Sequence, residues 1–396
     1  TFLLIINKNN ITGNKLVKLI KISLISFLGS IPLNIYYNHE INFLSLIYNL
    51  FYVPIFNLIV FPFSLLTIIF YPLDNLFFNF MNKLSLITSY LSKITFLTFN
   101  FKKISIFILI IYILLMIYVI NNLLKKKYKS LIMIITVLVI HLNINKIIPT
   151  NQVIFLDVGQ GDASFISLEN KNILIDTGGL FSSNPSEEII TMLKSFGINK
   201  LDFLIISHGD FDHMGDSIYF VNNFKVSNVI LNEGPYNELE KKLLKVLEEK
   251  GIKSYNLVDS INIENVKFKF LNTKIYDNEN DNSRVIYFNY KTYKFLFMGD
   301  ASIKKEKDII LNYNLEDIDF LKVGHHGSNT SSSKEFIDSI NPRYSMISVG
   351  KNNRYGHPKA SVLSILKNSK VYRTDIDGSI IVNLNENKYK ISTCSP

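Results

Sequence analysis

The 396-residue sequence predicts an α-helical transmembrane bundle followed by a separate α/β domain, in which helices cover a sandwich of mostly antiparallel sheets. Long stretches of the first 150 residues carry no charge, whereas from Asn151 onward short apolar runs alternate with turns rich in Gly and Asp. The first 150 residues also contain 13 lysines and only two acidic residues, Glu40 and Asp74. The formal net charge of +9 therefore comes from the membrane flanks and is not the footprint of a soluble nucleic-acid-binding domain.

Residues 1–147 are expected to form the membrane domain. Residues 41–73 and 104–124 contain no charged residue, and each run meets the length of about 20 apolar residues that a bilayer requires. Shorter uncharged runs at 22–39 and 130–145 predict further spans. Three prolines interrupt the longest run, which is tolerated in membrane helices where neighbouring helices satisfy the freed carbonyl groups. Residues 76–100 interleave lysines and serines with apolar residues, which predicts an amphipathic helix.

The ends of these runs predict how the chain lies in the membrane. The uncharged stretch from Thr1 to Asn7 is interpreted as the end of an earlier span, so a missing amino-terminal part of the same protein would complete the membrane domain. Four lysines at 125–129 lie in the short loop between the last two spans, and loops of this kind stay in the cytoplasm. We therefore expect a multi-pass protein of the cytoplasmic membrane, with everything after about Lys146 on the outer side.

Residues 151–396 are expected to form the second domain. Apolar runs bounded by turn residues predict strands at 153–156, 163–168, 173–175, 201–206, 229–231, 266–271, 285–290, 293–298 and 379–384. Helices are predicted between them at 186–195, 236–250, 303–311 and 359–368. Strands and helices thus alternate along this half of the chain.

The segment Ser207-His208-Gly209-Asp210-Phe211-Asp212-His213-Met214-Gly215 is the strongest functional signal, because it directly follows the apolar strand predicted at 201–206. Its imidazole and carboxylate side chains are metal ligands at close spacing. The pairs His208/Asp210 and Asp212/His213 could serve two cations about 3.5–4 Å apart, the separation used for in-line displacement at phosphorus.

Other predicted strands also end in residues of ligand type. Asp176 follows the strand at 173–175, Asp300 follows the strand at 293–298, and His325 follows the apolar run at 320–323. An isolated Asp in a glycine-rich turn is usually a turn former. Its recurrence after successive strands, beside the His208–His213 segment, favours a shared site at one sheet edge.

Five motifs together resemble the carboxyl-terminal portion of the ComEC DNA-uptake (competence) protein family. They are Asp157-Val158-Gly159-Gln160-Gly161-Asp162-Ala163-Ser164, Ile175-Asp176-Thr177-Gly178-Gly179, the 207–215 segment, Gly299-Asp300-Ala301 and Val323-Gly324-His325-His326-Gly327-Ser328. The membrane half is similar to the end of the competence domain of the same family. The resemblance implies a metallo-β-lactamase-like αββα sandwich with its metal site at the sheet edge.

The resemblance also implies a divalent metal site with two ions and assigns roles to residues. The superfamily signature is His-x-His-x-Asp-His, but Asp210 replaces its second histidine, and Asn282-Ser283 stands where a further histidine ligand is expected. Such an oxygen-rich site would favour Mn²⁺ over a tight Zn²⁺ site. His208 and Asp210 would hold one ion, Asp212 and His213 the other, and Asp300 would bridge them. Asp176 would orient a ligand histidine, whereas His325 and His357 compete for the last ligand position or for protonation of the leaving group.

The substrate and the function remain open between several hypotheses at this point. Ser328, Lys351, Arg354 and Tyr355 could contact phosphates and bases, and they begin a basic region that continues to Lys359, Lys367, Lys370, Tyr372 and Arg373. The alternative interpretation of this basic region is an ordinary solvated surface with no nucleic-acid partner. One hypothesis is a membrane component of natural transformation with a metal-dependent DNA nuclease domain, working on single-stranded DNA beside a channel and with other DNA-uptake proteins. The alternatives are a transport or DNA-binding module with an inactive hydrolase fold, and a membrane-tethered phosphodiesterase for a small or lipid-linked substrate.

Overall fold

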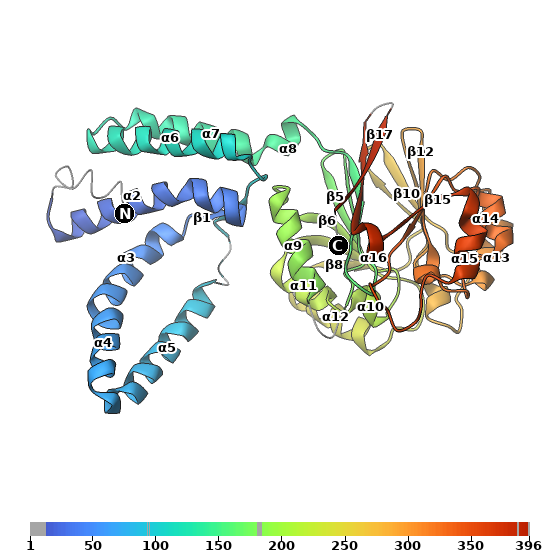
Figure 1. Ribbon diagram of the computed structural model, residues 1–396, viewed down its shortest axis with the longest axis horizontal. Helices are drawn as coiled ribbons and strands as arrows, with labels where there is room; N and C mark the ends of the chain where they lie inside the picture. Colours follow the sequence, from blue (N-terminus) through green and yellow to red (C-terminus); the bar gives the residue numbers. More distant parts are fainter. Residues whose placement is uncertain (1–12, 93, 95, 180–183, 386–387, 395–396) are drawn as a thin grey trace. The chain divides into compact units, whose positions relative to one another are not determined.

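A computed structural model describes residues 13–92, 94, 96–179, 184–385 and 388–394. The chain divides into two compact units (Figure 1). One contains residues 1–144 and 194–198, and the other contains residues 145–193 and 199–396. The apolar stretch predicted at residues 1–7 lies outside the described residues.

The first unit is helical, as its hydropathy predicts. Among the described residues, three helices are long and apolar enough to cross a membrane: Val17–Asn38, Ser45–Ile69 and Ile106–Leu124. The second of these contains α3 (Ser45–Ile55), a π-helical segment (Phe56–Val60) and α4 (Phe61–Ile69), so the helix continues past Pro54 and Pro62. Helix α7 (Lys129–Leu142) is apolar but has only 14 residues.

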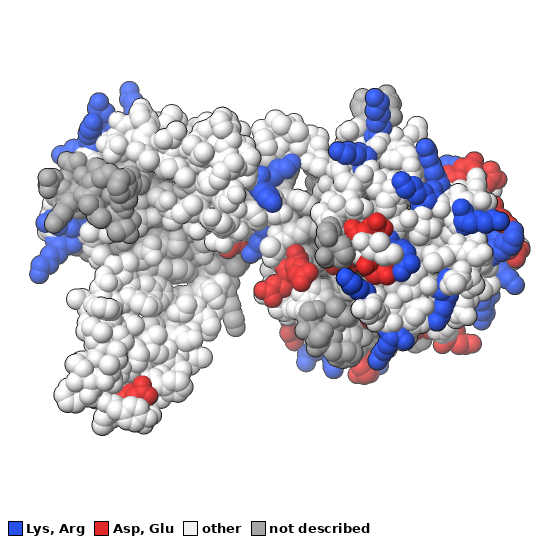
Figure 2. All heavy atoms as spheres, in the orientation of Figure 1, with Lys and Arg blue, Asp and Glu red and all other residues white. Residues whose placement is uncertain are grey.

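The surface of this unit is apolar, which is the property a membrane requires. Side chains of α4 and its surroundings are exposed to an extent that water would penalise, for example Leu58 at 75% and Ile68 at 79%. The visible face is almost without charged side chains away from its lysines (Figure 2). Helix α5 (Asp74–Ser92) covers most of the region predicted as an amphipathic helix. The last residues of that region form the short strand β2 (Thr98–Asn100), which pairs with β1 (Glu40–Asn42).

The second unit is a four-layer αββα sandwich. In the described part of the chain, one sheet has eight strands in the order β17-β16-β3-β4-β5-β6-β7-β8, and the other has seven in the order β15-β14-β13-β12-β11-β10-β9. Strands β16 (Ser379–Leu384) and β17 (Tyr389–Cys394) come last in the sequence and form one end of the first sheet. Helices α9 (Pro185–Ser195), α11 (Ser217–Asn223) and α12 (Glu238–Glu249) cover the first sheet, and α13 (Ile303–Asn312), α14 (Lys334–Ile340) and α15 (Ala360–Ile365) cover the second (Figure 1). The sheets pack through a core rich in phenylalanine, in which Phe155 stacks on Phe297 with ring centroids 5.5 Å apart.

The expectation of mostly antiparallel sheets is only half right. Strands β3 (Gln152–Phe155), β4 (Ser164–Leu168) and β5 (Lys171–Ile175) are antiparallel, but β5, β6 (Leu201–Ile205), β7 (Val226–Ile230) and β8 (Lys253–Tyr255) are parallel. The second sheet repeats this division. Strands β9 (Ser260–Ile263), β10 (Val266–Phe270), β11 (Ile286–Tyr290) and β12 (Tyr293–Phe297) are antiparallel, whereas β12 to β15 are parallel. Parallel neighbours need a crossover connection, and the helices between these strands supply it.

Parallel strands bring distant parts of the chain to one edge of the sandwich. Strands β5, β6 and β12 end just before Asp176, Ser207 and Gly299. Strands β13 (Phe320–Lys322) and β14 (Tyr344–Ile347) end just before Val323 and Ser348, and β15 is Lys370–Arg373. The carboxyl ends of strands in open α/β sheets are where ligand sites form. All of the predicted ligand motifs therefore meet at this edge.

Candidate metal centre

The segment after β6 carries two fully buried histidines. Helix α10 (Phe211–Met214) begins within the segment, and its short turn sets His213 beside His208 with ring centroids 4.1 Å apart. Asp210 precedes the helix, but its carboxylate makes no capping hydrogen bond and its side chain is 46% exposed. The turn fits closely against the glycines after β5, since a Cβ at Gly179 would lie 2.0 Å from the carbonyl oxygen of Phe211.

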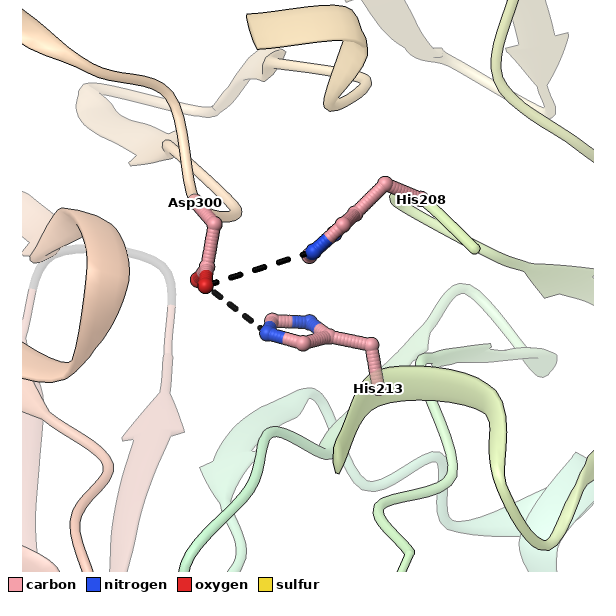
Figure 3. Close-up of side chains that lie close together, drawn as sticks. All are labelled: His208, His213 and Asp300. Carbon is pink, nitrogen blue, oxygen red and sulfur yellow. Dashed lines mark ion pairs between the residues drawn. The ribbon is translucent and has the colours of Figure 1, made fainter. Parts of the chain in front are cut away.

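Asp300 meets both histidines from the opposite sheet (Figure 3). Its Oδ1 lies 3.1 Å from His213 Nε2, and its Oδ2 lies 4.0 Å from His208 Nε2. The backbone before it turns through Gly299 at φ +55°, and the Asp300 amide donates to Ser283 Oγ. The close approach of these three side chains is thus built into the turn between β12 and α13.

Asp176 holds His213 from behind. Its Oδ2 lies 2.9 Å from His213 Nδ1, and its two oxygens also accept hydrogen bonds from the amide and the hydroxyl of Ser207. A carboxylate on Nδ1 keeps that nitrogen protonated and holds the ring with Nε2 facing Asp300. The sequence predicts that Asp176 orients a ligand histidine, and this contact is the one through which it would do so.

His326 is the site residue that the sequence analysis did not select. Its Nε2 lies 3.1 Å from Asp212 Oδ2 and 4.0 Å from Asp300 Oδ2, and its Nδ1 contacts the carbonyl oxygen of Ser348 at 3.0 Å. His325 is also near, with Nε2 3.6 Å from Asp300 Oδ2 and Nδ1 2.9 Å from Thr330 Oγ1. Both histidines have left-handed backbones, at φ 48° and 53°, so the turn lets adjacent residues face the same centre.

His357 lies farther out than His325. Its ring centroid is 6.0 Å from that of His325, and it belongs to none of the ligand clusters found among the described residues. Burial, followed by the positive charges around His326, His325 and Lys359, lowers the pKa of His357 to about 4. His357 is therefore a neutral imidazole at physiological pH.

The described residues fit a divalent cation. His208 Nε2, His213 Nε2 and Asp300 Oδ1 are buried without a hydrogen-bond partner among them, although the last two atoms lie only 3.1 Å apart. Buried polar atoms normally find a partner, so atoms that converge without one indicate a missing ligand. Three clusters of described residues have ligand atoms within 4.8 Å of one another: His208 with His213 and Asp300, Asp212 with His213 and His326, and Asp162 with Asp176 and His213.

Charge coupling in the centre is strong. Burial alone would raise the pKa of Asp300, but the imidazoles of His213, His326 and His208 hold it well below its ordinary value. At His213, burial alone would lower the pKa, but the carboxylates of Asp300 and Asp176 outweigh it and raise the pKa well above its usual value. Imidazolium protons thus neutralise the carboxylates, and a binding cation would take over that role as the imidazoles release their protons.

A buried ion pair lies directly beneath the centre. Lys322 Nζ is 2.7 Å from Asp162 Oδ1 and 2.8 Å from Asp162 Oδ2, and both side chains are almost fully buried. Asp162 Oδ2 is 3.9 Å from His213 Nδ1. The chain therefore supplies one fixed positive charge of its own to this carboxylate-rich region.

Three residues clamp the peptide groups of Gly209, between His208 and Asp210. The Gly209 amide donates to Glu279 Oε1 at 2.8 Å, and its carbonyl accepts from Asn237 Nδ2 at 2.6 Å. Glu240 lies against the glycine, and burial raises its pKa to about 7. No motif indicated these residues, because Asn237 and Glu240 lie at the start of α12 and Glu279 lies in a later loop, all far from His208 in sequence.

The predicted nucleic-acid contacts separate in space. Arg354 and Tyr355 are exposed and contact each other, and Lys351 is exposed on the same loop. Ser328 is buried, and its hydroxyl accepts a hydrogen bond from Thr330 Oγ1, so it does not share the exposed surface of these three residues. Arg373 is paired with Asp375 through two hydrogen bonds of 3.0 and 2.6 Å, which removes it from the predicted basic surface.

Solved structures with a similar fold include the metallo-beta-lactamase fold protein YhfI from Bacillus subtilis. It is 11% identical at a TM-score of 0.40, covering 59% of this chain and 100% of that one. A diphosphatase from the PhnP family is 13% identical at a TM-score of 0.36, covering 59% of this chain and 99% of that one.

Family models match both halves of the sequence. One described as the metallo-beta-lactamase superfamily matches residues 156–351, and one described as competence protein matches residues 4–126. ComE operon protein 3 of Bacillus subtilis is 29% identical over 91% of this chain and 51% of its own length. Competence protein ComA of Neisseria gonorrhoeae is 30% identical over 59% of this chain and 32% of its own length. Recombination protein 2 of Haemophilus influenzae is 33% identical over 61% of this chain and 30% of its own length.

These relatives are longer than the sequence: the chain spans about half of the first of them and about a third of the other two. The matches follow the order of the two units, with competence-protein sequence in the helical unit and metallo-β-lactamase sequence in the sandwich. The chain therefore belongs to the ComEC family, in which a competence-protein membrane region precedes a domain of the metallo-β-lactamase superfamily.

Proposed function

We propose that this chain is part of a membrane protein for DNA uptake in natural transformation, and that its sandwich domain is a metal-dependent phosphodiesterase that degrades DNA beside the channel. Membership of the ComEC family and the apolar helices support the uptake role. The enzymatic part depends on one observation. Buried, unpartnered nitrogens of His208 and His213 converge with Asp300 Oδ1 from the ends of separate strands.

Each residue of the centre has a role in this proposal. Two divalent cations, Mn²⁺ or Zn²⁺, would supply an acidified water and neutralise charge on the phosphodiester. His208 and Asp210 would bind on one side, and Asp212, His213 and His326 on the other, with Asp300 between them. Asp176 keeps the His213 ring in place and its Nδ1 protonated, so that Nε2 is the nitrogen that would face a cation.

His325 would protonate the leaving oxygen. Its side chain is 25% exposed, so it faces both solvent and Asp300, whereas His326 is buried. Thr330 Oγ1 contacts the other ring nitrogen and fixes the ring orientation. His357 is unsuited to this step because an imidazole with a pKa of about 4 is uncharged at neutral pH and has no imidazolium proton to donate.

A second candidate function is a transport or DNA-binding module without hydrolysis. Asn282 and Ser283 favour it, because both side chains are engaged by the protein itself: Asn282 bonds the backbone of Tyr276, and Ser283 Oγ accepts from the Asp300 amide. The cation beside His208 would then have few ligands. A domain that holds only one cation firmly would bind a strand without cleaving it.

Hydrolysis of single-stranded DNA by the detergent-solubilised chain tests the proposal. With Mn²⁺ we expect cleavage that EDTA abolishes and that falls at least about 100-fold in Asp300→Asn and in His213→Ala. Asp338→Asn is the matched control, because Asp338 is an exposed carboxylate whose partner is Lys334 on α14. Cleavage that persists in both site variants would exclude this centre as the catalytic one.

The proposal also places the sandwich domain on the outer side of the cytoplasmic membrane. Its support is the lysine-rich loop between α6 (Ile106–Leu124) and α7, which the positive-inside rule assigns to the cytoplasm. The sequence has one cysteine, Cys394, and it is exposed. A membrane-impermeant maleimide should label Cys394 in intact spheroplasts; labelling only after lysis would place the domain in the cytoplasm.

A further inference from the structure

The loop between β14 and α15 presents an exposed aromatic ring beside the metal centre. The loop is held firmly at several points. Val349 bonds Thr374 Oγ1 through both its amide and its carbonyl, at 2.8 and 2.9 Å, and the Gly350 amide donates to Gln160 Oε1 at 3.2 Å. Asn353 then ties the loop to itself, donating to the carbonyls of Gly350 and His357 at 3.1 and 2.8 Å. The backbone that carries the side chains of this loop is therefore held by the fold.

These side chains form a row that leads away from Asp300. His325, 3.6 Å from Asp300, is followed by His357 at 6.0 Å between ring centroids. Tyr355 comes next, nearly parallel to the His357 ring at 21° and 5.7 Å away. The Arg354 guanidinium lies 4.9 Å from the centre of the Tyr355 ring, and its Nη2 donates to the Tyr355 hydroxyl at 2.6 Å.

The outer end of this row is open to solvent and positively charged. Tyr355 is 46% exposed, and Lys351 and Arg354 are exposed on the same loop. Lys359 reaches back to the Tyr355 carbonyl at 2.7 Å. Among the described residues, none of these three cations is paired with a carboxylate, although the neighbouring metal centre is rich in carboxylates.

An exposed tyrosine under a guanidinium is a surface that a nucleobase can share. Arg354 can leave the ring at little cost, since it is exposed and bound there by a neutral hydroxyl, and it can then contact a phosphate. Base stacking on an aromatic side chain contributes about 1–3 kcal/mol per base and does not depend on sequence. If Tyr355 served only to cover His357, its ring would not need to be exposed. The unpaired cations Lys351, Arg354 and Lys359 would not be needed either.

We propose that Tyr355 and Arg354 form a subsite for the nucleotide next to the scissile phosphodiester, with the base on the tyrosine ring and its phosphate on the guanidinium. This rests on the proposed phosphodiesterase function and deepens it, because it identifies the substrate class. The substrate would be a nucleic-acid strand or another nucleotidyl ester, as opposed to a lipid-linked or simple phosphodiester.

Binding and hydrolysis by the full detergent-solubilised chain test the subsite separately. Binding is measured by the anisotropy of a short fluorescein-labelled oligothymidylate in EDTA, where no hydrolysis occurs. Tyr355→Leu should weaken binding about tenfold, and Tyr355→Phe should bind as the unmodified chain does. Arg354→Gln should reduce the salt dependence of binding by about 0.7 in log–log slope. Tyr255→Leu is the matched control, because Tyr255 is 41% exposed on β8 of the other sheet.

Hydrolysis is compared between the p-nitrophenyl esters of thymidine 5′-phosphate and of methyl phosphate, with Mn²⁺. The kcat/KM ratio of the thymidine ester to the methyl ester should fall about tenfold in Tyr355→Leu and stay constant in Tyr255→Leu. An unchanged affinity and an unchanged ratio in Tyr355→Leu would overturn the subsite. If neither ester is hydrolysed but Tyr355→Leu still weakens DNA binding, the phosphodiesterase proposal fails while the subsite stands.

Discussion

Removing the ammonium group of Lys322 should destabilise the sandwich domain substantially. Methionine in its place keeps most of the side-chain volume but leaves Asp162 as an unpaired buried carboxylate. The Lys322 and Asp162 side chains are only 3% and 6% exposed, with nitrogen and oxygen 2.7 Å apart. Breaking a buried ion pair by removing one partner costs about 3–5 kcal/mol, and we expect a loss in this range for Lys322→Met at neutral pH.

The loss should depend on pH with a definite sign. Burial would raise the pKa of Asp162, but Lys322 first, and then His326 and His213, hold it below its ordinary value. The pairing therefore contributes stability above the ordinary pKa of about 4, and this is lost as pH falls through the lowered value. In Lys322→Met the lysine no longer opposes the effect of burial on Asp162. The carboxylate is therefore protonated at a higher pH, and its protonation removes the free-energy cost of a buried unpaired charge. The difference between the variant and the unmodified chain should shrink from about pH 7.5 to about pH 5.5.

Pulse proteolysis of the detergent-solubilised chain across a urea gradient measures this, because it follows the fragment that carries the sandwich domain. Asp162→Asn combined with Lys322→Met should recover most of the loss, since no charge is then left unpaired. Lys334→Met is the control: Lys334 is 78% exposed and pairs at the surface with Asp338, so its loss should stay within about 0.5 kcal/mol. A loss below about 1 kcal/mol in Lys322→Met, or one that is the same at both pH values, would refute the reasoning.

Three further changes test the surroundings of the centre. Asp176→Asn should weaken Mn²⁺ binding about 10–100-fold by calorimetry, because it removes the carboxylate that holds His213; unchanged affinity would contradict that role. Gly209→Ala should cost about 1–3 kcal/mol by pulse proteolysis, since the new Cβ would lie 2.4 Å from Asn237 Nδ2, and a negligible cost would show that the clamp yields. Burial raises the pKa of Glu240 from 4.5 to about 7, so its favourable contribution is complete below 4.5 and is lost as pH rises through about 7. Glu240→Gln should therefore gain stability relative to the unmodified chain between about pH 6 and about pH 8, and a difference that is flat with pH would count against a buried carboxyl there.

The parts of the structure that follow from local chemistry could be predicted from the sequence. A bilayer demands long apolar helices, and the uncharged runs at 41–73 and 104–124 correspond to candidate spans Ser45–Ile69 and Ile106–Leu124. The strand ends that carry Asp176 and Asp300 were visible for a similar reason, because buried strands must be apolar and the ligands come directly after them.

Features that depend on backbone turns or distant loops could not be predicted. The place of His326 in the site could not be predicted, because the side chains of neighbouring residues normally point apart. The left-handed backbone at His325 and His326 lets both side chains approach Asp300. The hydrogen bonds to the peptide groups of Gly209 could not be predicted, because Glu279 lies 70 positions away in sequence. Parallel pairing in both sheets was underestimated, since strand direction is decided by the crossover helices and leaves little trace in an apolar run of five residues.

The pairing of β16 (Ser379–Leu384) with β3 limits when the sandwich domain can complete its folding during synthesis. Ile380 lies opposite Phe155, so a strand near the beginning of the domain gains its outer neighbour only when residues near the end are available. Until then β3 is an unprotected edge that can recruit strands from other molecules. Synthesis on the ribosome would leave the growing domain in this state for most of its translation, because such distant contacts close last. Chaperone capture of the nascent chain at this edge is the expected safeguard.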